Sequence, residues 1–151
     1  MTGRAGGSRV RRGGPGQEAM VAVLVAASRL LARLEEVCAG ADITHDQYNL
    51  LRILRGAEPE GLARFAVAER LINRAPDVTR LLDRLERDGL VRRERSEDDR
   101  RLSIARITAR GLALLDRLDP AVLAVHREAT APLDAATLRA ITEGCRRLAL
   151  S

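Results

Sequence analysis

Arginines recur on one face of a segment, Pro76 to Asp88, whose apolar spacing predicts a helix. The apolar residues fall on the opposite face, so Arg80 and Arg84 are expected to point into solvent. A guanidinium group is planar and always charged, and its donors match phosphate oxygens and the edge of guanine. The pattern therefore predicts contacts with nucleic acid. The structural alternative is a solvated helix face on which these arginines pair with neighbouring acids.

Residues around the start of the same segment are further candidates for DNA contacts, namely Asn73, Arg74 and Thr79. Asp77 could accept a hydrogen bond from a cytosine amino group. An acid in the first turn of a helix is also favoured by the helix dipole, and we rank that structural explanation higher. The other arginines of the region are expected to contact phosphates or nothing: Arg87, Arg92, Arg93 and Arg95.

Two helices joined by a tight turn must position these arginines. The first is predicted over residues 63–71, and the second has Pro76 at its first position and Gly89 as a left-handed cap at its end. This order is the helix-turn-helix layout. Residues 90–95 and 102–107 read as two strands of a hairpin, or wing. The first helix is expected to be partly buried through its apolar residues: Phe65, Val67, Ala68 and Leu71.

Helices are also predicted on both sides of this unit. Residues 17–38 carry an apolar stripe too wide for one partner, which predicts packing against the chain's own domain and against a second copy. Thr44 and Gln47 form a capping box for a helix from Asp46 to about Gly56. This helix is expected to bury four residues: Tyr48, Leu50, Leu51 and Leu54.

Two more helices are predicted after the hairpin. Thr108 can cap the first, and Asp119-Pro120 either kinks it or restarts it. The last helix begins at Asp134. It is expected to bury Leu138, Ile141, Cys145 and Leu148.

The composition narrows the classes of function. The chain has 151 residues, of which 46% are hydrophobic and 1% aromatic, and its net charge is +5. Tyr48 and Phe65 are the two aromatic residues, which argues against proteins that stack single-stranded bases on aromatic side chains and leaves double-stranded DNA open. All 26 basic residues are arginine, which suits phosphate binding but could equally reflect genome composition.

Other features of the sequence argue against catalysis, metal binding and export. Two cysteines and two histidines show no metal-ligand spacing, no nucleophile is paired with a base, and no cofactor loop is present, so neither an enzyme nor a cofactor is expected. The sequence has no signal peptide or membrane span, and we expect a cytoplasmic protein. Residues 1–15 are rich in Gly and Arg and are predicted to be a flexible basic arm.

From about residue 17 to 150 the chain resembles the MarR family of winged-helix transcriptional regulators. The most specific part is Asp99-x-Arg101, followed after five residues by Ile107-Thr108, where the family usually has Leu-Thr. Val78-Thr79-Arg80 and Gly89-Leu90-Val91 match as well. The Thr44-x-x-Gln47 start of the second helix also fits.

This resemblance implies a mainly α fold with a small β-hairpin wing (α+β) and one MarR-like domain over residues 16–151. Within it, residues 16–40 and 109–151 would be dimerisation helices, and residues 44–108 the winged helix, with the wing at about 90–107. The recognition helix would enter the major groove of a pseudo-palindromic operator, and the wing the minor groove. Arg101 would be the wing-tip residue and Asp99 the carboxylate that orients it, while Arg100 could bind a phosphate or substitute for Arg101.

The resemblance also implies a homodimeric, sequence-specific regulator of transcription, expected to be a repressor released by a small-molecule ligand. Many members of the family bind aromatic or phenolic acids between the dimer helices and the winged helix, and here the candidate contacts are Cys38, His45, Tyr48 and Arg52. Redox sensing through Cys38 or Cys145 is not favoured. Both cysteines lie near the C-terminal end of a predicted helix, where the helix dipole disfavours a thiolate, and both lie on apolar stripes. The alternative function is a winged-helix module that binds a protein and has no specific DNA site.

Overall fold

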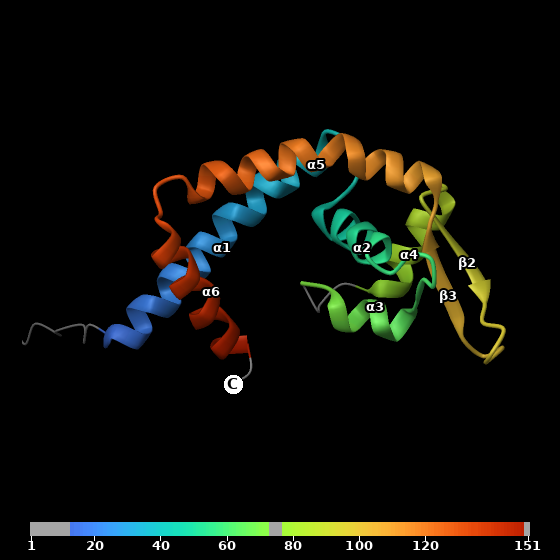
Figure 1. Cartoon of the computed structure of the whole chain (residues 1–151), viewed down its shortest axis with the longest axis horizontal. Coiled ribbons are helices and arrows are strands. Elements are labelled where there is room, and N and C mark those ends of the chain that lie inside the picture. The colour runs from blue at the N-terminus through green and yellow to red at the C-terminus, as the bar shows by residue number, and fades with distance from the viewer. Residues whose placement is uncertain (1–12, 73–76, 150–151) are drawn as a thin grey trace, which may run out of the picture.

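The chain folds as helices around a small antiparallel sheet, and the computed structural model describes residues 13–72 and 77–149. In Figure 1 the molecule is an arch: a long helix crosses the top, two helices form one leg, and the sheet with three shorter helices forms the other. The helices are α1 (Pro15–Ala39), α2 (His45–Arg55), α3 (Arg64–Arg70), α4 (Val78–Arg87), α5 (Ala109–Thr130) and α6 (Ala135–Ala149). The strands are β1 (Leu62–Ala63), β2 (Val91–Arg95) and β3 (Ser103–Ile107). The mainly α fold with a β-hairpin wing is confirmed.

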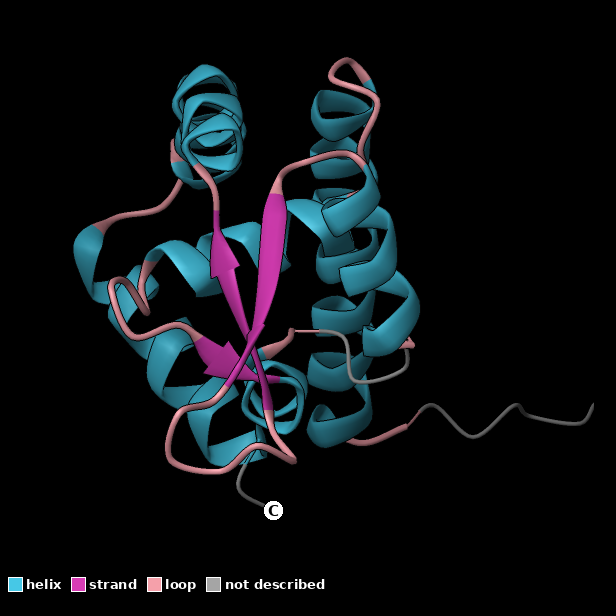
Figure 2. Cartoon of the chain, turned by 90° about the vertical axis from the view of Figure 1, so that its right-hand side faces the viewer, coloured by secondary structure: helices cyan, strands magenta, loops and turns pink. Residues whose placement is uncertain are grey.

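The sheet has the order β1-β3-β2, and both pairings are antiparallel. In Figure 2 the hairpin of β2 and β3 faces the viewer. Strand β1 was not predicted, because two residues are too few to show a period. Its approach to β3 requires Gly61, which has a φ of 71° and where a Cβ would lie 2.6 Å from the carbonyl oxygen of Ala105.

The predicted helix caps are present. The Thr44 hydroxyl accepts a hydrogen bond from Gln47 N, and the Gln47 side chain accepts one from Thr44 N, which completes the capping box. Thr108 caps α5 by accepting from Gly111 N at 3.1 Å. Gly89, with a φ of 71°, ends the turn after α4 as predicted.

One predicted helix start needs correction, and an alternative left open at Pro120 is decided. Helix α4 begins at Val78 because the Asp77 carboxylate accepts from Arg80 N at 3.2 Å and so serves as the N-cap. Pro76, predicted as the first helical residue, lies outside the described residues. Of the two alternatives at Asp119-Pro120, a restart is excluded, because α5 runs through Pro120 and continues to Thr130.

The core lies mainly among α2, α4, α5 and the sheet. Its fully buried side chains include Leu50, Leu51, Leu54, Val67, Leu82, Leu85 and Leu115. Phe65 is 56% exposed, so its predicted burial is wrong: it lies at the start of α3, while Val67 and Leu71 face the core. None of the helices in the described ranges is long and apolar enough to cross a membrane.

The leg made by α1 and α6 exposes much of its apolar surface. Helix α1 buries Leu34 and Cys38, near its C-terminal end, whereas Leu24 is 69% exposed. The prediction that α6 buries its apolar face is wrong for the single chain, because no α6 residue is buried. Leu138 is half-buried, and Ile141, Cys145 and Leu148 are exposed. In the single chain this leg therefore presents exposed apolar side chains on both α1 and α6.

Candidate DNA interface

Helix α4 turns an arginine-bearing face to solvent. Val78, Leu82 and Leu85 are buried on its inner face. On the outer face the Arg80 side chain is 87% exposed, and its nearest acid is the N-cap Asp77, with 3.8 Å between Arg80 Nε and Asp77 Oδ2. An exposed pair at that distance restrains the guanidinium only weakly. Arg80 is therefore available to a ligand outside the protein.

The other predicted contacts of this region lie around the same helix. Thr79 and Arg84 are exposed on α4. Asp77 serves as the N-cap of α4, one position before the first turn in which the sequence placed it. Asn73 and Arg74 lie outside the described residues.

The tip of the wing carries a second exposed arginine. The Arg101 side chain is 91% exposed, and it bends back onto Asp99: Nε lies 3.2 Å from Asp99 Oδ1, and the backbone N–H of Arg101 donates to the same oxygen at 3.0 Å. These hydrogen bonds hold the pKa of Asp99 below its usual value, the backbone bond contributing most. The carboxylate thus restrains Arg101 without burying its charge. Arg100 beside it is exposed as well.

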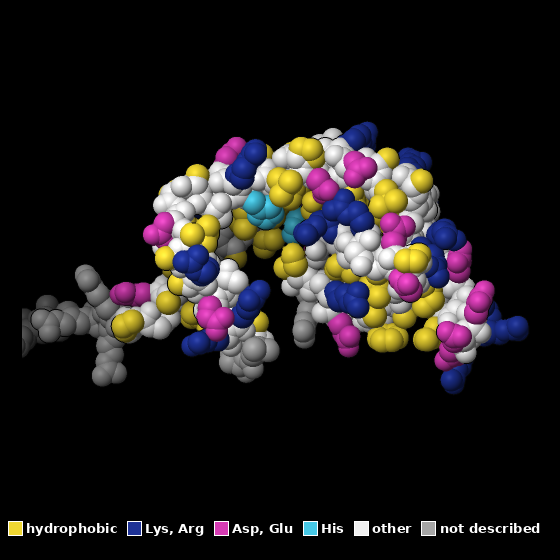
Figure 3. Space-filling view, in the orientation of Figure 1, with side chains coloured by type: hydrophobic (Ala, Val, Ile, Leu, Met, Phe, Trp, Pro, Cys, Tyr) yellow, Lys and Arg dark blue, Asp and Glu magenta, His cyan; other side chains and the backbone are white. Residues whose placement is uncertain are grey.

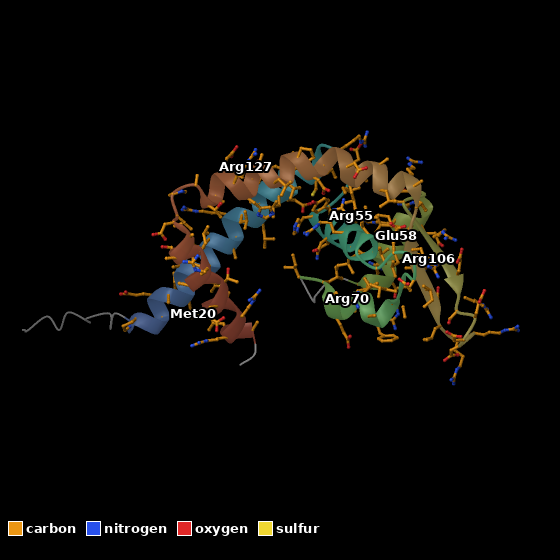
Figure 4. All side chains as sticks on the ribbon, in the orientation of Figure 1. Met20, Arg55, Glu58, Arg70, Arg106 and Arg127 are labelled. Carbon is orange, nitrogen blue, oxygen red and sulfur yellow. The ribbon has the colours of Figure 1, made fainter. Side chains whose placement is uncertain are left out.

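The recognition helix and the wing project on the same leg of the arch. Figure 3 shows dark blue arginine side chains at the wing tip, at the lower right. Figure 4 labels Arg70 on α3 and Arg106 on β3, two more cations of this leg. Arg106 is partly neutralised by Glu94, whose Oε2 lies 3.6 Å from Arg106 Nε.

Arg93, in the middle of β2, is used inside the protein. Its Nε donates to Glu86 Oε2 at 2.9 Å, and Nη2 lies 2.7 Å from Asp83 Oδ1. The sequence predicts for Arg93 a phosphate contact or no contact, and the structure shows an internal ion pair instead. The i,i+3 spacing of the two acids on α4 is a signal for this pairing, but the placement of the predicted strand against α4 cannot be read from local pattern.

The residues predicted to contact a ligand lie close together, but most are buried. Cys38 is 0% exposed, Tyr48 3% and His45 9%. Arg52 is exposed, with its guanidinium carbon 5.9 Å from the centre of the Tyr48 ring. Figure 3 shows a hollow between the two legs, with the chain's two histidines (cyan) at its top. Burial, and secondarily Glu35, raises the pKa of the Cys38 thiol to about 11.

Asp119 joins α5 to α2 in this region. Its two carboxylate oxygens accept from the Tyr48 hydroxyl at 2.9 Å and from Arg55 Nη1 at 2.7 Å. Arg55 lies on α2 beneath α5 (Figure 4). Burial, followed by the hydrogen bond to Asp119, raises the pKa of Tyr48 to about 12. The Tyr48 hydroxyl therefore stays protonated and serves as a structural donor.

Comparisons with known proteins agree with this architecture. The MarR family model matches residues 43–103, which run from the end of the α1–α2 loop to the start of β3. A MarR transcription factor from Planctomyces limnophilus is 35% identical, and its crystal structure superposes with a TM-score of 0.68 over 93% of this chain and 100% of that one. The chain belongs to the MarR family. The MarR family consists of transcriptional regulators and not of enzymes.

Two further proteins are similar to this chain over most of their length. The homoprotocatechuate degradative operon repressor of Escherichia coli is 28% identical over 122 residues, which are 81% of each chain. The PcaV transcriptional regulator of Streptomyces coelicolor, solved with its natural ligand, is 29% identical, with a TM-score of 0.68 over 91% of this chain and 93% of that one.

Proposed function

We propose that this MarR-family protein is a homodimeric repressor that binds double-stranded operator DNA and is released from it by a small organic ligand. The observation that carries the proposal is that the two elements suited to DNA each carry an exposed arginine, Arg80 in the first turn of α4 and Arg101 at the tip of the wing. The Arg80 and Arg101 side chains are 87% and 91% exposed. Guanidinium groups on a helix and on an adjacent hairpin suit the major and minor grooves of one duplex.

The apolar surface of α1 and α6 supports a second copy of the chain as partner. Exposed contiguous apolar surface of this kind marks an interface in soluble proteins. The exposed large apolar residues of this leg include Met20, Val21, Leu24, Leu31 and Ile141. In this arrangement residues 16–40 and 109–151 form the dimer, and residues 44–108 of each copy read one half-site. A two-fold dimer reads half-sites about one helical turn, roughly 34–36 Å, apart.

Repression and ligand release are proposed from relatives and from the hollow between the legs. One relative is named as an operon repressor, and another was solved with a natural ligand. A ligand bound between the legs would interact differently with two spacings of the winged helices, and such differential affinity is what couples two binding sites. Arg52, exposed beside Tyr48, is the residue we propose for an acidic ligand group.

The test is fluorescence-anisotropy binding to the chain's own upstream intergenic duplex and to a scrambled duplex over a salt series. The proposal expects tight binding to the first duplex, at two protomers per site, and weaker binding after Arg101→Ala. Equal and weak binding to both duplexes, with a steep salt dependence, would leave only non-specific electrostatic attraction. That result would favour a winged helix that binds a protein partner.

A further inference from the structure

Arg93 ties the wing to the recognition helix through several contacts at once. Glu86 on α4 accepts from the Arg93 backbone N–H at 3.1 Å through Oε1 and from Nε at 2.9 Å through Oε2. Asp83, three residues earlier on the same helix, lies 2.7 Å from Arg93 Nη2. The Arg93 side chain is 28% exposed. One guanidinium thus spans two acids on α4, a fork that a lysine could not reproduce.

This contact lies where it can set the angle of the wing. Helix α4 ends at Arg87 and β2 begins at Val91, so a short turn containing Gly89 is the covalent link between them. Arg93 is the third residue of β2. From there to the wing turn the strand extends about 10 Å, at roughly 3.3 Å per residue. A rotation of about 15° at Arg93 would shift the turn by about 3 Å, which is enough to break a hydrogen bond to a fixed partner.

The same contact explains why a helix suited to DNA carries acids. Asp83 and Glu86 would repel phosphates more strongly if they were unpaired, and the single positive charge of Arg93 offsets part of their combined negative charge. The hydrogen bond from the Arg93 side chain holds the pKa of Glu86 below its usual value, so the carboxylate stays ionised and paired. The acids are thus part of the support for the wing and not a surface offered to DNA.

We propose that Arg93 is a positioning residue for DNA binding: by bridging Asp83 and Glu86 it fixes the wing relative to α4, so that Arg101 and Arg80 reach adjacent grooves together. The inference rests on the proposed function and adds to it the contact that fixes the wing relative to α4 in each protomer. It differs from a phosphate contact, because Arg93 acts through Arg101 and does not touch DNA.

The direction in which one substitution changes the affinity for DNA distinguishes this role from simple electrostatics. Glu86→Ala removes a negative charge near a polyanion, so electrostatics alone predicts tighter binding to the upstream duplex. The positioning role predicts roughly tenfold weaker binding, the size of one lost base contact. Asp88→Ala is the matched control, since it removes a carboxylate from the end of α4 whose nearest cation is the adjacent Arg87, at 3.6 Å. The control should bind equally or slightly more tightly.

A double-mutant cycle that combines Glu86→Ala with Arg101→Ala tests whether the bridge affects DNA binding through Arg101. If the bridge acts through the wing, Arg101→Ala weakens operator binding about tenfold in the wild type but less than about twofold in Glu86→Ala. Arg93→Lys serves as a second variant, should Glu86→Ala unfold: it keeps the charge, so it should leave binding to the scrambled duplex unchanged while weakening operator binding.

Two results would overturn the inference while leaving the proposed function intact. One is operator binding by Glu86→Ala that is as tight as that of Asp88→Ala. The other is an equal cost of Arg101→Ala in both backgrounds. If Arg101→Ala has no effect even in the wild type, the wing does not bind DNA, and both the proposed function and the positioning role are wrong.

Discussion

The Tyr48 hydroxyl allows a direct test of how α2, in one leg of the arch, is joined to α5 across the top. Tyr48→Phe removes one oxygen and keeps the ring in the core, where the residue is 3% exposed. The lost bond runs to Asp119, which keeps its bond to Arg55. A hydrogen bond to a charged group contributes about 1.5–3 kcal/mol. Because the Asp119 side chain is 27% exposed, water recovers part of this, and we expect a loss of about 1–2 kcal/mol.

Asp119→Ala should be more damaging than Tyr48→Phe. It leaves the buried Tyr48 hydroxyl without its acceptor and removes the partner of Arg55. We expect a loss of about 2–3 kcal/mol, below the cost of breaking a fully buried ion pair because both side chains are partly exposed.

The assay is urea unfolding followed by circular dichroism at a fixed protein concentration, because dimerisation makes apparent stability depend on concentration. Tyr48→Phe should cost about 1–2 kcal/mol in the wild type and close to nothing in Asp119→Ala, since the acceptor is already gone. An equal cost of Tyr48→Phe in both backgrounds would refute the assignment of this hydrogen bond as a tie between α2 and α5.

The pH dependence of the free energy of unfolding is a second test of the contacts that Asp119 makes. Burial tends to raise the pKa of Asp119, but the hydrogen bonds from Arg55 and Tyr48 outweigh it, and the pKa is lowered. A carboxyl with a folded pKa below its unfolded value of about 3.9 stabilises the fold above that pH. This contribution is lost as the pH falls through the folded pKa. Asp119→Asn should therefore flatten the acid limb of the stability curve, and an unchanged limb would contradict the shift.

Three other expectations concern the dimer, the buried thiol and the wing. Leu24→Asp, at a residue 69% exposed in the single chain, should convert the dimer to monomer in sedimentation equilibrium while leaving the helical circular dichroism largely unchanged; a dimer of unaltered affinity would place the interface elsewhere. In a Cys145→Ser variant, Cys38 should resist a thiol reagent at neutral pH until the protein is unfolded, because it is fully buried with a pKa of about 11; rapid labelling would contradict that burial. Asp99→Ala should weaken operator binding by freeing Arg101 while leaving the salt dependence about the same; unchanged affinity would show that Asp99 does not orient the arginine.

Local chemistry predicted most of the fold. Thr44, Thr108 and Gly89 mark helix boundaries through hydrogen bonds or a backbone conformation that involve near neighbours in sequence, so their roles can be read directly. The apolar periodicity of α2 and α4 predicted their buried faces for the same reason. Strand β1 could not be predicted in this way, because its two residues are held by pairing with β3, more than 40 residues away.

The contacts that organise the candidate site depend on distant pairings. Tyr48 and Asp119 are 71 residues apart, and no local rule predicts that the hydroxyl on α2 meets the carboxylate on α5. The pairing of Arg93 with the acids of α4 likewise depends on the position of β2 against α4, which local sequence does not give. The apolar spacing of α6 predicts a buried face, but no residue of this helix is buried in the single chain, because the spacing does not indicate which surface would cover it.

Hydroxyl-radical footprinting of the upstream intergenic duplex tests the central claim most directly. The account predicts two symmetric protected regions about one helical turn apart, for the two copies of α4, flanked by minor-groove protections that disappear in Arg101→Ala. Diffuse protection without symmetry or sequence preference, unchanged by Arg101→Ala, would contradict a dimer that reads DNA through both α4 and the wing.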